Sequence, residues 1–80
     1  MSDKKLSAVL RYYLSELKRL RKRVPVVSAG RLAGEMGVSR STAKKYLAEL
    51  VRQGWVWEYD YTHTNGQEAT AYIPGGVNNG

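Results

Sequence analysis

The chain has 80 residues, enough for one small domain, and contains no cysteine, which excludes disulfides and thiolate metal sites as sources of stability. Its formal net charge of +6 suits a polyanionic partner, although a merely soluble basic domain would carry the same charge. We expect a soluble cytoplasmic protein, because no apolar run approaches the roughly 20 residues of a membrane-spanning helix and the first ten residues lack a signal-peptide core.

The charge is unevenly distributed along the chain. All 13 Lys and Arg residues precede residue 53, whereas the segment after it holds three of the seven acidic residues and no cation. The sequence therefore predicts an electropositive first part, followed by a slightly acidic second part.

The first predicted element is a long amphipathic helix. Its apolar residues recur at alternating spacings of four and three, which places them on one helical face. They are Leu6, Leu10, Tyr13, Leu17, Leu20 and Val24. We expect a cap at Ser2 or Asp3 and an end near Arg23, because Pro25 disfavours continuation. About 20 residues is long for this domain, so the helix either packs on the following helices or also forms a homodimer seam.

Cations cluster at the end of this helix, at Arg19, Arg21, Lys22 and Arg23. Two interpretations remain open for them. They could contact phosphates, or they could simply complement the helix dipole and the free carbonyls of the last turn.

Residues 28–54 have the pattern of a helix-turn-helix. Ser28 is placed to cap a helix over Ala29–Met36, the turn is Gly37-Val38-Ser39, and a second helix follows over residues 40–53. Val27 and Leu32 have the spacing of a hydrophobic staple, which fixes how the chain enters the first of these helices. A short helix, a glycine turn and a longer basic helix are typical of this motif.

After Gly54 the apolar period changes from helical to two, which indicates a strand rich in aromatic residues. Asn65-Gly66 predicts the turn of a hairpin, with a return strand over residues 69–73 that ends at Pro74. The alternating aromatics are Trp55, Trp57, Tyr59 and Tyr61. We expect them mainly to cover the core, with Trp57 and Tyr61 the most exposed; a platform for stacking single-stranded bases is the alternative.

The segment LAGEMGVSRSTAKKYLAELVRQGWV, together with the hairpin after it, resembles the winged helix-turn-helix domain of bacterial and archaeal transcriptional regulators. The resemblance covers residues 28–74, with the first helix as support. It implies an α+β fold of three helices followed by a two-stranded β-hairpin wing. On this basis residues 1–74 form the winged helix-turn-helix domain, and residues 75–80 a flexible C-terminal tail.

The resemblance also implies that the third helix enters the major groove of double-stranded DNA while the wing reaches the flanking minor groove or backbone. The residues that match the DNA-binding positions are Ser39, Arg40, Ser41, Thr42, Lys44 and Lys45. On the wing, the side chains available for hydrogen bonds to DNA are Asn65, Gln67 and His63. Arg40 suits a bidentate contact to guanine, and the lysines suit phosphates. The wing departs from the family pattern because it lacks Lys and Arg at its tip and carries acidic neighbours, so it either donates hydrogen bonds to DNA or docks on a partner.

No set of residues suggests an enzyme. His63 is the one histidine and falls in the predicted turn, and no glycine spacing matches a phosphate-binding loop. We expect no cofactor, no metal, no small-molecule ligand and no membrane partner. The favoured function is sequence-specific DNA binding by a transcriptional regulator, for which a homodimer through the first helix is one arrangement. The alternative is an assembly module that binds structured RNA or a protein in a replication, transcription or ribonucleoprotein complex.

Overall fold

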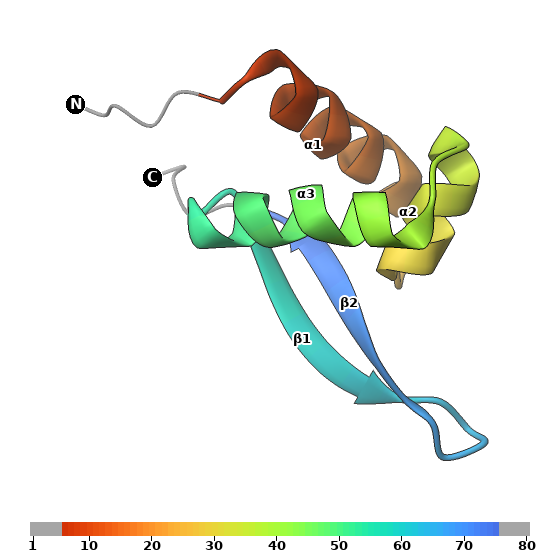
Figure 1. Cartoon of the computed structure of the whole chain (residues 1–80). Coiled ribbons are helices and arrows are strands. Elements are labelled where there is room, and N and C mark those ends of the chain that lie inside the picture. The colour runs from red at the N-terminus through yellow and green to blue at the C-terminus, as the bar shows by residue number, and fades with distance from the viewer. Residues whose placement is uncertain (1–5, 76–80) are drawn as a thin grey trace.

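The computed structural model describes residues 6–75, and in them three helices precede a β-hairpin (Figure 1). The elements are α1 (Ala8–Arg21), α2 (Ala29–Met36), α3 (Arg40–Arg52), β1 (Val56–Thr62) and β2 (Glu68–Pro74). This order confirms the α+β winged helix-turn-helix fold. Within the described residues, no helix combines the length and apolar character needed to cross a membrane.

Helix α1 is shorter than predicted. It begins after Ser7, whose hydroxyl accepts the Leu10 N–H at 3.3 Å, and it spans 14 residues. The predicted caps, Ser2 and Asp3, lie outside the described residues. At the other end the N–H of Arg23 turns back to the carbonyl of Leu20 at 2.9 Å, so the chain leaves the helix before the predicted end. Within the described residues α1 therefore has 14 residues instead of the roughly 20 predicted, and a homodimer through this helix stays a prediction.

One core joins the three helices to the base of the hairpin. Its largest fully buried side chains come from α1, the connector before α2, α2 and α3. They are Leu17, Val27, Leu32, Leu47 and Leu50. Each such side chain contributes about 1.5–3 kcal/mol through burial, which makes this small cluster the main source of stability. Val27 and Leu32 are both fully buried, which agrees with the predicted staple.

The turn between α2 and α3 has the predicted geometry. Gly37 adopts φ 73°, a left-handed conformation that glycine enters at little cost, and the Val38 N–H donates to the Ala33 carbonyl at 3.0 Å. Ser28 and Ser39 cap the two helices through their hydroxyls, at 3.2 Å from the Arg31 N–H and 3.1 Å from the Thr42 N–H. These local contacts fix the angle between α2 and α3.

The hairpin is antiparallel, with Val56 paired to Pro74 at its base and Thr62 paired to Glu68 at its far end. The connector before α2 adds a short third edge to the hairpin: the Tyr72 N–H donates to the Val27 carbonyl at 2.9 Å, and Ser28 forms a β-bridge with Ala71. This contact ties the hairpin to the start of α2. The Gly75 N–H donates to the Trp55 carbonyl, while residues 76–80 of the predicted tail lie outside the described part of the chain.

Trp55 of the aromatic stripe packs against the core, but the rest of the stripe does not cover it, which corrects that prediction. Trp57 is exposed as predicted, whereas Tyr59 and not Tyr61 is the second exposed residue. Val56 on the opposite face of β1 is buried, whereas Trp57 is 59% exposed and Tyr59 is 39% exposed. Trp55 and Tyr61 are half-buried. The physical reason is that the hairpin diverges from the helices after its base (Figure 1), so burial on its inner face is confined to residues near that base, Val56 and Tyr72.

Candidate nucleic-acid interface

Helix α3 turns one row of side chains into the core and leaves the others on the surface. Ala43, Leu47 and Leu50 are fully buried. With 3.6 residues per turn, this leaves Arg40 and Lys44 on one exposed row and Ser41 and Lys45 on a second, outward row. Both rows begin at the N-terminal end of α3, beside α2 (Figure 1).

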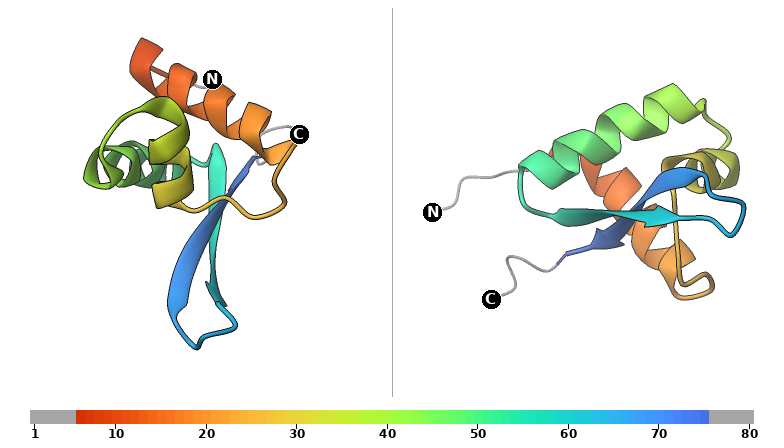
Figure 2. Two further views of the ribbon diagram at one scale, coloured as in Figure 1. Left: turned by 90° about the vertical axis from the view of Figure 1, so that its right-hand side faces the viewer. Right: turned by 90° about the horizontal axis from the view of Figure 1, so that it is seen from below.

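A cleft of about 690 Å³ lies between the N-terminal turns of α2 and α3 and the distal part of the hairpin. Its walls include Arg31 of α2, Arg40 and Lys44 of α3, and His63 and Gln67 of the hairpin. Figure 2 shows that the hairpin projects away from the helices, which leaves the cleft open to solvent. Residues from three elements far apart in the sequence thus meet at one concave surface.

The cleft is electropositive. Arg31, Arg40 and Lys44 are all exposed, and within residues 6–75 none of them forms an ion pair. A Cβ added to Gly30 would lie 3.6 Å from the Cδ of Arg40, so the aliphatic stem of Arg40 runs close to the first turn of α2. Glu68 is the acidic residue of the cleft wall. Three cations against one carboxylate favour an anionic ligand such as a phosphate.

Ser39 and Thr42 lie at the start of α3 and bond to each other. The Ser39 hydroxyl accepts the Thr42 N–H and donates to the Thr42 hydroxyl at 2.9 Å. Both hydroxyls therefore shape the helix start, whereas Ser41 and Lys45 stay exposed. The Lys45 ammonium lies 5.4 Å from the centre of the Tyr46 ring, a distance at which cation–π attraction holds it near the protein surface.

The two predicted wing residues have different surroundings. Gln67 lines the cleft, opposite the cations of α3. The side-chain oxygen of Asn65 instead accepts the Gln67 N–H at 3.0 Å and helps to form the turn, in which Gly66 takes φ 91°. The structure therefore brings Arg40, Lys44 and Gln67 together and leaves Asn65 at the exposed tip.

A family model of the HTH domain matches residues 14–61 of this sequence. The chain belongs to the HTH domain family. Domains of this class bind DNA with the second helix of the motif, which is α3 here. The match covers the end of α1, the whole of α2 and α3, and most of β1. It therefore includes every cleft cation.

This HTH domain is also similar in fold to two solved structures of Lactococcus lactis ZitR, each of a different point mutant. Each comparison gives a TM-score of 0.64 and 19% sequence identity, over 94% of this chain and 47% of ZitR. The chain thus spans about half the length of the solved structures it matches. Among curated proteins, no match was found.

Two residues of the HTH domain's cleft escaped the sequence prediction. Arg31 and Tyr61 both line the cleft, although neither was assigned to DNA binding. Arg31 carried a usable signal, because it lies in the first turn of α2, where a cation opposes the helix dipole. Tyr61 carried none, since the alternation of β1 does not reveal which face turns toward α2.

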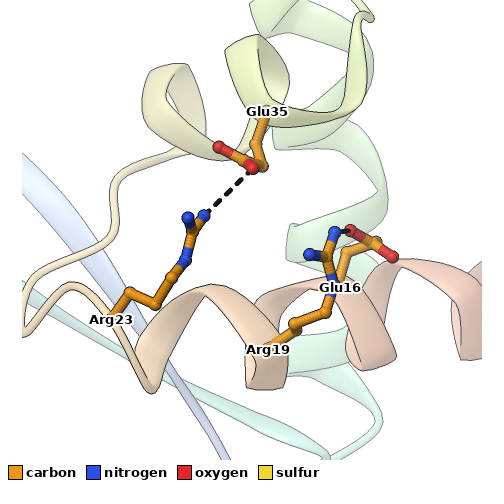
Figure 3. A network of polar contacts seen from close by, with 4 residues as sticks. All are labelled: Glu16, Arg19, Arg23 and Glu35. Carbon is orange, nitrogen blue, oxygen red and sulfur yellow. Dashed lines mark hydrogen bonds and ion pairs between the residues drawn. The ribbon is translucent and has the colours of Figure 1, made fainter.

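The cation cluster at the end of α1 is largely engaged within the HTH domain. Arg23 forms an ion pair with Glu35 of α2 at 3.0 Å, and Arg19 pairs with Glu16 one turn earlier (Figure 3). The hydrogen bond to Glu16 raises the pKa of Arg19. Arg21 donates to the carbonyl of Pro25. The contacts of Arg21 and Arg23 join the end of α1 to the connector and to α2, and the Arg19 pair lies within α1. Three of the four cluster residues thus have partners inside the domain, and whether any of them also contacts phosphate stays open.

Proposed function

We propose that the protein is a sequence-specific double-stranded DNA-binding transcriptional regulator that inserts α3 into the major groove. The observation that carries this proposal is the cleft in which Arg31, Arg40 and Lys44 gather beside the exposed rows of α3 without ion-pair partners among the described residues. A major groove about 12 Å wide admits one α-helix, and the cleft is open at the side where the flanking backbone would lie.

In this arrangement each residue has a role that follows from the chemistry of its side chain. Arg40, in the first turn of α3, makes a bidentate contact to guanine, and the short Ser41 lets the helix approach the base edges. Lys44 and Lys45 neutralise phosphates on either side of α3. Ser39 and Thr42 hold the helix start, where the backbone N–H groups of the first turn add a phosphate contact.

The hairpin contributes hydrogen bonds rather than positive charge. Gln67 faces the cleft and is positioned to bond the DNA backbone, with Asn65 at the tip in reach of the flanking minor groove. Glu68 on the same wall repels phosphate. The hairpin therefore limits where the DNA backbone can lie and does not attract it electrostatically.

Specific recognition is completed by a homodimer on a palindromic site, since one recognition helix reads only a few base pairs. The N-terminal half of α1 supports an interface there, because Val9 and Tyr12 are exposed apolar side chains in the first two turns of the helix. Sedimentation at micromolar concentration, with and without a palindromic duplex, tests this interface. A monomer in both conditions would rule it out.

The test of the DNA-binding proposal is the double variant Arg40→Ala with Lys44→Ala, measured by fluorescence anisotropy on a duplex selected from a random pool. A bidentate base contact is worth about 1–3 kcal/mol, so we expect at least a tenfold loss of affinity at fixed salt. Both side chains are exposed, so the fold should survive, and circular dichroism checks that it does. Unchanged binding by a folded double variant would overturn the proposed role of α3.

A second function is supported by one observation, the exposure of Trp57 and Tyr59 on a hairpin that carries no cation. Such a surface suits an assembly module that binds structured RNA or a protein partner. Two single variants, compared in the same duplex-binding assay, distinguish the two functions. If Trp57→Ala leaves duplex affinity intact while Arg40→Ala abolishes it, duplex DNA is the ligand of α3, and the aromatic face has no part in that binding.

A further inference from the structure

A second cationic surface lies on α1, separate from the cleft. Arg11, Lys18 and Lys22 are exposed and fall on one face of the helix, at spacings of seven and four residues. They border a shallow groove whose lining comes entirely from α1 and the residue after it. No residue is shared between this groove and the cleft beside α3. We call Arg11, Lys18 and Lys22 the α1 stripe.

The positive charge of the α1 stripe is not neutralised inside the described part of the domain, although Arg11 donates a hydrogen bond to the Leu6 carbonyl at 3.2 Å. None of its three side chains forms an ion pair within residues 6–75, in contrast to Arg19 and Arg23. Lys18 and Lys22 lie at the C-terminal end of α1, where cations complement the helix dipole, whereas Arg11 lies in the first turn, where a cation is unfavourable. Glu16, the single acidic residue of α1, pairs with Arg19 and leaves the stripe with one sign of charge.

The stripe faces away from the cleft. Helices α1 and α3 pack on each other through one shared core, so their exposed faces point in different directions. Figure 2 shows α1 at the end of the domain opposite the hairpin tip. A duplex seated on α3 and in the cleft therefore leaves the α1 stripe open to solvent.

We propose that the α1 stripe binds the phosphate backbone of a second DNA duplex, so that one protein bridges two DNA segments. The inference rests on the proposed function of α3 for the first duplex. The twelve residues from Arg11 to Lys22 span about 16 Å along the helix, a length that covers several phosphates, since each strand places one about every 3.4 Å along the duplex axis. Lys18 and Lys22 meet phosphates as point charges, and phosphate contacts carry no sequence information, so the stripe binds this second duplex independently of its sequence.

Bridging is tested by capture. A duplex of about 20 base pairs is immobilised, saturated with the full chain, and exposed to a second, fluorescent duplex. We expect wild-type protein to retain the second duplex, and Lys18→Glu with Lys22→Glu to retain at least tenfold less. In the same samples, the affinity for a single duplex should change by less than threefold. Lys18→Arg with Lys22→Arg, which keeps the charge, is the matched control and should capture as the wild type does.

Charge reversal near the C-terminus of α1 could unfold the domain, so a neutral double variant, Lys18→Gln with Lys22→Gln, is measured as well. This variant should also fail to retain the second duplex. Bridging is refuted if a folded variant of either kind captures normally, or if wild type binds one duplex but never a second. Sedimentation without DNA adds a third check. Loss of self-association together with loss of capture would make α1 an interface between copies and refute direct DNA contact. Failure of wild type to bind even one duplex would instead refute the proposed function.

Discussion

At the scale of single residues, Tyr13 connects α1 to α3 through an aromatic contact. Its ring lies 4.8 Å from that of Tyr46, and its side chain is almost fully buried. Burial is the main cause that raises the pKa of the Tyr13 hydroxyl, with smaller contributions from Tyr46 and Tyr12. The neutral phenol is therefore the form that the folded domain favours.

This raised pKa makes stability fall at alkaline pH. Above about pH 10, the ordinary pKa of tyrosine, the unfolded chain releases its phenolic proton first, so the free energy of unfolding decreases by up to about 1.4 kcal/mol per pH unit for one group. Tyr13→Phe keeps the ring and removes the proton, so urea unfolding of this variant should depend less on pH in that range. Tyr12→Phe, at an exposed position, is the control. Equal pH dependence in the wild type and both variants would contradict the prediction.

At the scale of elements, the hairpin combines one cleft-lining carboxylate with hydrogen-bonding side chains. Glu68 lies on the cleft wall, whereas Glu58 lies outside the cleft. We expect Glu68→Gln to raise duplex affinity about three- to tenfold, because it removes a charge that repels phosphate at close range. Glu58→Gln changes the net charge equally and should alter affinity less than twofold. Anisotropy titrations at one salt concentration compare the two, and equal gains would show that net charge alone matters.

The sequence predicts some elements more accurately than others. The accuracy depends on the sequence separation between the residues whose contacts define each element. The bounds of α2 and the turn at Gly37 follow from contacts between residues at most five positions apart, and the prediction is confirmed there. The start of α1 depends on which of several short polar side chains takes the cap. Ser7 has that role, and pattern alone does not distinguish it from Ser2.

The hairpin face and the cleft are properties of tertiary structure. Alternation shows that Trp57 and Val56 point to opposite sides of β1, but the packing of β1 against the helices decides which side is buried. Likewise, Arg31 and Gln67 share the cleft only because the connector at Val27 pairs with β2 and sets the direction of the hairpin. The α3 residues and Gln67 could therefore be predicted as separate candidates, whereas the part of Arg31 and the shared cleft could not.

At the scale of the whole molecule, the cations separate into a recognition side and the α1 stripe. The recognition side holds Arg31, Arg40, Lys44 and Lys45, all exposed and outside any ion pair of the described residues. Other arginines are engaged with Glu16, Glu35 and Glu49, and the hydrogen bond from Arg52 lowers the pKa of Glu49. The positive charge that underlies the net +6 thus lies mainly on two surfaces, and different ligands can occupy them.

This separation predicts the salt dependence of binding to one short duplex. Each phosphate neutralised contributes about 0.9 to the slope of log affinity against log salt, so four contacts give a slope of about −3 to −4. Arg31→Ala should reduce the magnitude of that slope by about 0.9, because Arg31 faces the cleft. Lys18→Gln with Lys22→Gln should leave it unchanged when duplex is in excess, since each protein then holds a single duplex. Anisotropy titrations from low to physiological salt measure both slopes. If the α1 variant lowered the slope as Arg31→Ala does, one duplex would contact both surfaces, and the two could not act independently.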